Sequence, residues 1–274
     1  MPRQAATTFN PATCLVLSCS PRAGGNSDTA ARLFSEGCAQ GLRNRLEDED
    51  REGPEKSPPV FFLRDFAVKP CIACDACGKT ALSLKNATPP LTLREFVNGD
   101  IEQAGSRHAS ARPPFHCPLT RSDASAPLLR AFAEATCICL VSPVYFYHLP
   151  AMCKALLDRM QTFWRTRTLM PGSAERFLAL HRKTCRVILV AGQKHGRKLF
   201  AGALLSLKYA MSGIGARLAE PLLLRALDAP DDLKCSPEVM EQIRTYGREA
   251  GMELRASQEN WRNNLYPEIG SSDA

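Results

Sequence analysis

The sequence predicts an α/β fold built on a doubly wound parallel sheet of five strands. Two observations lead to this fold class: short runs that are apolar throughout recur along the chain, and amphipathic helical segments separate them. Strands of a parallel sheet are covered on both faces, so they read as continuous apolar runs and not as alternating ones. Five strand–helix units suit an open sheet better than an eight-stranded barrel.

Each element can be justified in chain order. Residues 14–18 (CLVLS) predict a buried strand, and residues 28–42 repeat apolar side chains at helical spacing. By the same criteria the remaining strands are expected at 60–63, 137–142, 186–191 and 218–224. The remaining helices are expected at 124–135, 149–164, 199–212 and 236–256. The last helix has a favourable start, because Ser236 is a good N-cap and Pro237 suits the first turn.

One segment interrupts the alternation of strands and helices. Residues 78–116 contain Pro89, Pro90, Pro113 and Pro114 and show weak periodicity. Proline and loop residues at this density are typical of connections. We therefore expect a long insertion after the second strand, with a short helix near 93–97.

The composition excludes several classes of protein. The chain has 274 residues, is 45% apolar and carries a formal net charge of +7, which is too apolar for a disordered chain. Twelve cysteines are about 4% of the chain, below the roughly 8–10% of a disulfide scaffold. No apolar run approaches the about 20 residues of a membrane helix, and the N-terminus lacks the apolar core of a secretory signal. We therefore expect a cytoplasmic protein that does not enter a membrane and whose cysteines are thiols or metal ligands.

A polar, glycine-rich loop follows the first strand and directly precedes a helix. Hydroxyl, amide and guanidinium groups are concentrated in it, on Ser18, Ser20, Arg22, Asn26 and Ser27. A helix N-terminus favours an anion, and the small residues between them let a phosphate approach the backbone. The loop matches neither the nucleoside triphosphatase pattern nor the dinucleotide-binding pattern. It predicts a phosphate site, with an ordinary capped turn as the alternative.

A second candidate loop follows the third strand. Residues 142–148 read SPVYFYH, so three aromatic side chains and a proline stand at the carboxyl end of a strand. Ligands of open parallel sheets bind at this edge, where the strand order reverses. The aromatic residues either stack on a planar ring or pack under the following helix. Because both loops lie at the same edge, together they describe a phosphate pocket beside a ring pocket.

These two loops resemble those of the flavodoxin-like NAD(P)H-dependent FMN reductase family. The resemblance rests on 19–27 (CSPRAGGNS), 142–146 (SPVYF) and 154–159 (KALLDR), and spans about residues 14–251. It implies a single flavodoxin-like FMN-binding domain over residues 1–274, with FMN at the carboxyl edge of a five-stranded sheet. Residues 69–77 (KPCIACDAC) resemble the iron–sulfur flavoprotein branch of the family.

Carried over by position, the resemblance distributes the FMN site over three loops. The first loop would hold the phosphate, the third would hold the isoalloxazine ring, and the loop after the fourth strand would contribute less. The implied residues are Ser18, Ser20, Pro21, Arg22, Gly25, Asn26, Ser27, Pro143, Val144, Tyr145, Phe146, Gly192 and Gln193. No side chain is expected to act as a catalytic acid or base, because the flavin carries the chemistry. The resemblance also implies a homodimer or homotetramer.

Three cysteines stand close together in the sequence. Cys71, Cys74 and Cys77 form C-x2-C-x2-C, a spacing at which thiolates can meet one face of a cubane cluster. In the iron–sulfur branch the fourth cysteine follows within a few residues, whereas here Cys117 comes 40 positions after Cys77. Residues 115–119 (FHCPL) lead into Ser122 and Asp123 much as the family's segment does, so the insertion would separate the third ligand from the fourth. Because loop-closure entropy grows slowly with length, the insertion need not abolish the site, and the resemblance implies a [4Fe–4S] cluster on Cys71, Cys74, Cys77 and Cys117.

Other interpretations of these cysteines stay open. Four cysteines also suit zinc, His108 or His116 can replace a cysteine ligand, and the motif can be present without any metal, as in flavin-only relatives. The other eight cysteines lie mostly on predicted strands or apolar helix faces, at positions 14, 19, 38, 137, 139, 153, 185 and 235. They are expected to pack as small hydrophobic residues.

The positive charge is concentrated in one stretch. Residues 165–198 contain nine Lys or Arg residues and one acid, which leaves the rest of the chain near neutrality. Beside a flavin such a stretch would attract NAD(P)H, an acidic redox protein or an anionic substrate; the alternative is a solvated basic face. Nucleic-acid binding is not expected, because no recognition motif accompanies the charge.

Three functions follow from these observations. The first is an iron–sulfur flavoprotein that passes electrons between NAD(P)H or ferredoxin and an acceptor through FMN and a [4Fe–4S] cluster. The second is a flavin-only NAD(P)H-dependent quinone, azo or nitro reductase with unused cysteines. The third is a non-enzymatic module that holds zinc at the cysteines and binds nucleic acid through the basic stretch.

Overall fold

A computed structural model describes residues 14–43, 57–85, 117–169 and 183–265. The helix expected near 93–97, His108, His116 and most of the expected insertion lie outside the described residues. None of the helices within the described ranges has the length and hydropathy needed to cross a membrane.

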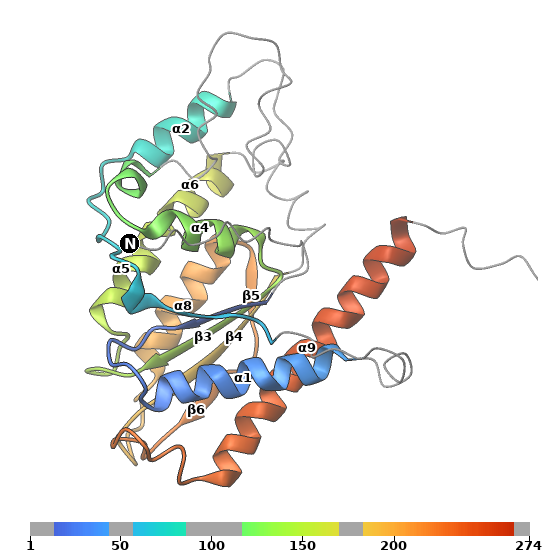
Figure 1. Cartoon of the computed structure of the whole chain (residues 1–274). Coiled ribbons are helices and arrows are strands. Elements are labelled where there is room, and N and C mark those ends of the chain that lie inside the picture. Colours follow the sequence, from blue (N-terminus) through green and yellow to red (C-terminus); the bar gives the residue numbers. More distant parts are fainter. Residues whose placement is uncertain (1–13, 44–56, 86–116, 170–182, 266–274) are drawn as a thin grey trace, which may run out of the picture.

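A parallel sheet occupies the centre of the chain (Figure 1). Its strands are β1 (Cys14–Ser18), β2 (Val60–Phe62), β3 (Cys137–Pro143), β4 (Lys183–Val190), β5 (Ala216–Leu218) and β6 (Leu222–Leu224). The order is β2-β1-β3-β4-β5 with every pairing parallel, and β6 also pairs with β4. This is the flavodoxin-like order, with its reversal between β1 and β3. The predicted fold class is confirmed.

The fifth strand differs from the prediction. Residues 218–224 were expected to form one strand, but they are divided between β5 and β6. β5 pairs with residues 183–185 and β6 with residues 188–190, so both lie along the same edge of β4. Pro221 lies in the gap and has no N–H for the ladder, which accounts for the interruption.

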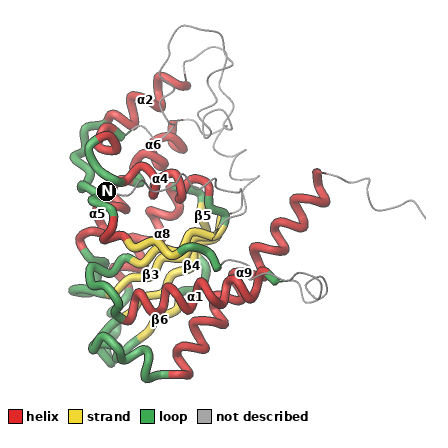
Figure 2. The backbone as a smooth tube through the Cα atoms, viewed as in Figure 1, coloured by secondary structure: helices red, strands yellow, loops and turns green. Residues whose placement is uncertain are grey.

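Helices cover both faces of the sheet (Figures 1 and 2). On one face lie α1 (Asn26–Leu42) and α9 (Pro237–Leu265); on the other lie α4 (Ser125–Glu134), α5 (Ala151–Arg159) and α8 (Ala201–Gly213). β1 and β3 contribute alternate residues to the two cores, because successive side chains of a strand point to opposite faces. Leu15 and Leu17 belong to one core and Val16 to the other.

Two further predictions about helices need correction. The helix expected at 149–164 is two helices, because α5 ends at Arg159 and α6 (Gln161–Leu169) begins after Met160. Met160 and Phe163 are both buried in the same core, so the apolar pattern continues through the break and conceals it. The first residues of the expected insertion are also helical, because residues 78–85 belong to α2 (Ala76–Lys85), which packs against α6.

α1 and α9 are in backbone contact where they cross. A Cβ atom on Gly41 would lie 2.0 Å from the carbonyl oxygen of Arg248, and one on Gly247 would lie 2.2 Å from that of Phe34. No larger residue fits at either position without moving a helix. This contact holds the N-terminal helix, whose first turn borders the site described next, firmly against the sheet.

Candidate functional site

A cavity of about 390 Å³ opens at the carboxyl ends of β1, β3 and β4. Eleven of the thirteen residues that the sequence predicted for the FMN site line it, and the two exceptions are Ser18 and Pro21. Sequence reasoning missed six further lining residues, namely Tyr147, Val190, Ala191, Leu199, Leu227 and Asp228. The structure therefore brings the three predicted loops together around one space.

A buried carboxylate supports the first loop from below. The side chain of Asp28 is fully buried, and its Oδ1 accepts hydrogen bonds from Ser18 Oγ at 2.7 Å and from Arg64 at 3.0 Å. Its Oδ2 accepts the N–H of Gly24 at 2.8 Å and lies 2.9 Å from the second terminal nitrogen of Arg64. Arg64 also donates to the carbonyl oxygen of Ser20 at 3.3 Å. Ser18 thus shapes the loop from inside, although it was predicted to contact the cofactor.

The Asp28–Arg64 pair gave no signal in the sequence. Asp28 reads as an ordinary acid in the first turn of a helix, where a negative charge is favourable. Arg64 is 36 positions away, in the short 3₁₀ helix Leu63–Asp65 after β2. Only the pairing of β1 with β2 brings the two side chains together.

The first turn of α1 borders the cavity. Gly25 is the N-cap and supplies no capping side chain, so the N–H groups of this turn have no partner within the helix. The Arg22 guanidinium lies over it, with Nε 3.2 Å from where a Cβ of Gly25 would be. A helix N-terminus beside a guanidinium is a suitable site for a phosphate.

Asn26 lines the cavity, but its side chain is occupied. Its Nδ2 donates to the carbonyl oxygen of Ala229 at 2.8 Å, and its Oδ1 accepts the N–H of Leu233 at 3.1 Å. The amide therefore ties α1 to the segment after β6. Because the amide is occupied, the backbone of Asn26 is the part of this residue that is left for a ligand of the cavity.

The aromatic loop after β3 is a tight, strained turn. Tyr145 and His148 exchange both backbone hydrogen bonds at 2.9 Å, and the two residues between them have positive φ angles, 50° at Phe146 and 62° at Tyr147. Such turns normally carry Asn-Gly, and a bulky residue in this conformation costs about 1–3 kcal/mol. Phe146 is also fully exposed, at 103% of its reference area. Strain and exposure in one aromatic turn are typical of a ligand contact.

α8 supports this turn from behind. A Cβ on Gly202 would lie 2.9 Å from the carbonyl oxygen of Tyr147, so only glycine lets the turn lie against the helix. His148 Nε2 and Ser206 Oγ share a hydrogen bond of 3.0 Å. The aromatic side chains are therefore held at the cavity by a regular helix.

The third wall comes from the loops after β4 and β6. Ala191 donates to the carbonyl oxygen of Leu224 at 2.9 Å and accepts the N–H of Leu227 at 3.1 Å, which aligns the two loops. A Cβ on Gly192 would lie 2.5 Å from Oδ1 of Asp228. Gly192 thus permits the approach of Asp228, an acid that faces the cavity and that the sequence did not identify.

The basic stretch does not form one continuous rim. Lys183 is buried and donates to the carbonyl oxygens of Ala133 and, at 2.7 Å, Ala135, at the end of α4; burial lowers its pKa to about 7. Arg186 pairs with Glu249 and Glu253 on α9. The exposed cations next to the cavity-lining Gln193 are Lys194, Arg197 and Lys198. Among the described residues of the stretch, these three cations lie nearest in sequence to the cavity lining.

The four predicted metal ligands are not gathered. Cys71 and Cys74 are exposed, and Cys77 and Cys117 are half-buried. Across the ranges that the structure describes, no three His, Cys, Asp or Glu side chains come together as a metal site. Of the other eight cysteines, all except Cys235 are buried, as expected of packing residues.

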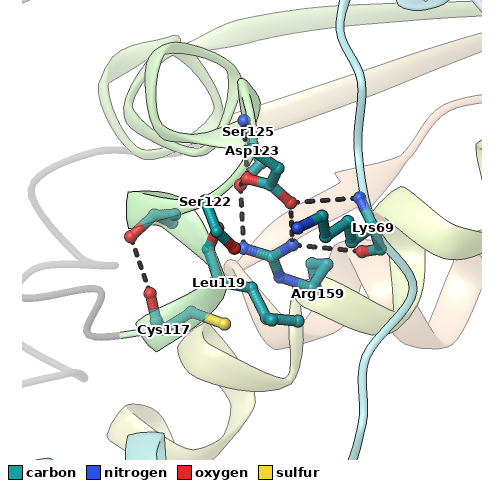
Figure 3. A network of polar contacts seen from close by, with 8 residues as sticks. Lys69, Cys117, Leu119, Ser122, Asp123, Ser125 and Arg159 are labelled. Atoms are coloured by element: carbon teal, nitrogen blue, oxygen red, sulfur yellow. Dashed lines mark hydrogen bonds and ion pairs between the residues drawn. The ribbon is translucent and has the colours of Figure 1, made fainter.

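The cysteine segment is nevertheless constrained. Ala73 and Asp75 have positive φ angles of 53° and 56°, and Asp75 forms an ion pair with Arg165 on α6. At its base lies a buried network around Arg159 and Asp123 (Figure 3). Burial raises the pKa of Asp123, but hydrogen bonds from Ser125, Arg159 and Lys69 outweigh burial and hold the pKa below its ordinary value.

Comparison with known families decides the class of protein. Residues 12–207 match the model of the NADPH-dependent FMN reductase family. The chain belongs to this family. As an NADPH-dependent FMN reductase family member it is an FMN-dependent NAD(P)H oxidoreductase, which confirms the predicted enzyme class and, of the predicted cofactors, FMN, and replaces the non-enzymatic interpretation.

Several solved structures are similar to this family member. One is an FMN-dependent NADH-azoreductase from Bacillus anthracis str. Ames Ancestor in complex with FMN, with 16% identity, coverage of 89% of this chain and 99% of that chain, and a TM-score of 0.47. Another is an NAD(P)H:quinone oxidoreductase from Methanothermobacter marburgensis, with 16% identity, coverage of 88% and 98%, and a TM-score of 0.42. A search of curated proteins found no match.

Proposed function

We propose that this chain binds FMN in the cavity of about 390 Å³ and uses NAD(P)H to reduce a quinone, azo or nitro compound. One observation carries the proposal: an uncapped helix N-terminus with a guanidinium and an exposed, strained aromatic turn line the same cavity. The first suits a phosphate and the second suits a planar ring. The donors and the aromatic residues therefore fit FMN.

Each wall of the cavity has a role in this proposal. Ser20, Arg22, Gly25, Asn26 and Ser27 would bind the phosphate, with Asn26 acting through its backbone. Pro143, Val144, Tyr145 and Phe146 would cover the ring and keep water from it, and Gly192 and Gln193 would close the third side. When bound, FMN supplies hydride and single-electron transfer, so the protein needs no acid or base of its own.

The phosphate contact can be tested by comparing FMN with riboflavin. In Arg22→Ala the affinity for FMN should fall about tenfold, whereas the affinity for riboflavin, which has no phosphate, should be unchanged. Arg217→Ala, an exposed arginine on β5 that does not line the cavity, is the control. Equal losses for both flavins, or no loss for FMN, would contradict the assignment.

A second candidate function adds a [4Fe–4S] cluster on Cys71, Cys74, Cys77 and Cys117, as in the iron–sulfur branch of the family. It is supported by the exposure of Cys71 and Cys74 and by the positive φ angles at Ala73 and Asp75, since strained backbone concentrates at functional sites. The four side chains do not fit a preformed site, so we route no step of the reaction through a cluster.

Metal analysis separates the two candidates. Iron, sulfide, zinc and flavin would be quantified on protein purified without oxygen. About four irons per chain, lost in Cys74→Ser and retained in Cys235→Ser, would establish the cluster. Cys235→Ser is the control, because Cys235 is also an exposed cysteine but lies outside the motif and is not a proposed ligand. Flavin without iron establishes the flavin-only reductase.

We also propose that residues 1–274 form one domain and that two copies associate as a homodimer. Trp164, Leu205 and Tyr209 are large apolar residues that remain exposed, at 47%, 58% and 64%. Trp164 and Tyr209 border a groove of about 310 Å³ between α5, α6 and α8, which Ser206 links to the aromatic turn. Tyr209→Glu should shift light-scattering mass from dimer to monomer, whereas an unchanged mass would contradict the proposed interface.

A further inference from the structure

We propose that the buried Arg159–Asp123 pair positions the cysteine segment and holds Cys71 and Cys117, 46 positions apart in sequence, at one edge of the molecule. The inference rests on the second candidate function, in which these thiols act as one ligand set. It concerns the residues that hold the thiols and not the identity of what they bind.

Arg159 ends α5, and its guanidinium is fully buried. One terminal nitrogen donates to the carbonyl oxygen of Lys69 at 3.1 Å and to Oδ2 of Asp123 at 2.5 Å. The other donates to Ser125 Oγ at 2.8 Å. Figure 3 shows that these partners come from two chain segments that meet at the end of α5.

Asp123 completes the connection between the two segments. Its Oδ2 accepts the N–H of Lys69 at 3.0 Å, and its Oδ1 accepts the N–H and hydroxyl of Ser125 at 3.0 and 2.6 Å. Both backbone groups of Lys69 are therefore held by the pair. Lys69 lies two residues before Cys71, and Asp123 lies six residues after Cys117.

The path from Asp123 back to Cys117 is short and regular. Residues Pro118–Arg121 form a 3₁₀ helix for which Cys117 is the N-cap. The carbonyl oxygen of Cys117 accepts both the N–H of Thr120 at 3.0 Å and its hydroxyl at 2.6 Å, and Ser122 bonds back to Leu119. Cys117 cannot move far from the pair while these bonds persist.

The pair shortens the chain that separates the two thiols. Without it, Cys71 and Cys117 are the ends of a 46-residue loop; with it, they are linked through about eight residues and one ion pair. Because the probability of loop closure falls as about the three-halves power of loop length, their effective concentration rises roughly tenfold.

A purely structural role explains these bonds less well. Fully buried ion pairs contribute little net stability compared with well-packed apolar residues. The contacts of this pair go to the residues flanking the cysteine segment and to Ser125, at the start of α4. A device that only anchored α5 would not need both backbone groups of Lys69.

Thiol cross-linking tests the proposal without requiring a metal. The full-length, metal-free chain is treated with dibromobimane, and cross-linked peptides are quantified by mass spectrometry. In the wild type, Cys117 should be linked to Cys71, Cys74 or Cys77. In Asp123→Asn, these links should fall about tenfold relative to the local Cys71–Cys74 link, which serves as an internal reference. In Ser125→Ala, which keeps the ion pair but removes one partner of Arg159, they should fall by a smaller factor. Asp158→Asn is the matched control, because Asp158 is an exposed acid on α5 next to Arg159. This variant should resemble the wild type.

The possible outcomes are distinct. Equal Cys117 links in the wild type and both variants, or none in the wild type, overturn the proposal. If Asp123→Asn does not fold, Ser125→Ala, which keeps the ion pair and removes one of its partners, decides the matter. Links that depend on the pair support the positioning role, and if protein purified without oxygen also holds neither iron nor zinc, the cluster is refuted. Iron bound equally by wild type and Asp123→Asn refutes the positioning role alone.

Discussion

Two aspartate–arginine pairs support two regions of the molecule, and only one of these regions forms a cavity. Asp28 and Arg64 lie beneath the first loop, and with Ser18 and Gly24 they fix its backbone at the border of a finished cavity. Asp123 and Arg159 fix only the residues flanking the cysteine segment, and the thiols between them remain apart. The comparison shows that the fold alone completes the cavity, whereas it only anchors the segment that carries the cysteines.

Strained backbone occurs in both regions, but it lines a cavity in only one of them. Phe146 and Tyr147 are strained within a turn that α8 supports and that lines the cavity. Ala73 and Asp75 are strained in a segment that carries the exposed Cys71 and Cys74. In the aromatic turn, the strain keeps an aromatic surface at the cavity. In the cysteine segment, it shapes a stretch of chain whose thiols lie apart.

The largest expected effect comes from neutralising each aspartate in turn. Asp123→Asn should lower the free energy of unfolding by about 3 kcal/mol, because it leaves the buried Arg159 without its counter-charge. Asp28→Asn should lower it by about as much or less, because its partner Arg64 is partly exposed. Only Asp28→Asn should also weaken FMN binding, by at least about tenfold, since it alone disturbs the phosphate loop. Urea denaturation and flavin titration measure both quantities. A loss of FMN affinity in Asp123→Asn would remove the distinction between the two regions.

The next effect separates the two strained segments. Phe146→Asn and Ala73→Asn should each raise the free energy of unfolding of the apoprotein by about 1 kcal/mol, because asparagine tolerates positive φ. Phe146→Asn should nevertheless bind FMN more weakly, whereas Ala73→Asn should bind it as the wild type does. Thermal melts and flavin titrations of the same preparations test this. If both variants bind FMN normally, the aromatic turn is not the ring contact.

The smallest effect is a pH dependence specific to the second pair. Because the pKa of Asp123 is lowered in the fold, its ionised form stabilises the protein above the unfolded pKa of about 4, and this contribution is lost as the pH falls through the folded value. The stability difference between wild type and Asp123→Asn should therefore be constant above about pH 5 and shrink as the pH falls below about 4. Urea midpoints across this range give the difference. A stability difference that increases toward low pH would contradict this prediction.

Local sequence patterns were sufficient to predict most elements of the fold. β1, β3 and β4 are apolar along their length because both faces are covered, so their runs identify them directly. The split between β5 and β6 and the break at Met160 were missed because apolar residues continue across both interruptions. The apolar pattern of a sequence indicates which side chains are buried. It does not reveal where backbone hydrogen bonding stops.

The candidate site was predictable where its residues are contiguous. The first loop and the aromatic loop were found because their chemistry lies within a few residues. Asp28 and Arg64 were missed, and Asn26 was expected to bind the ligand through a side chain that instead bonds to Ala229 and Leu233. These roles depend on partners distant in the sequence, so only the assembled sheet discloses them.

One measurement tests the central claim, that the cavity between α1 and the aromatic turn is an FMN site. The apoprotein would be titrated with FMN and with riboflavin while flavin fluorescence is followed. Saturation at one FMN per chain, with quenching by the aromatic turn and an affinity at least about tenfold above that for riboflavin, is the result we predict. Absence of saturable FMN binding, or equal affinity for the two flavins, would contradict it.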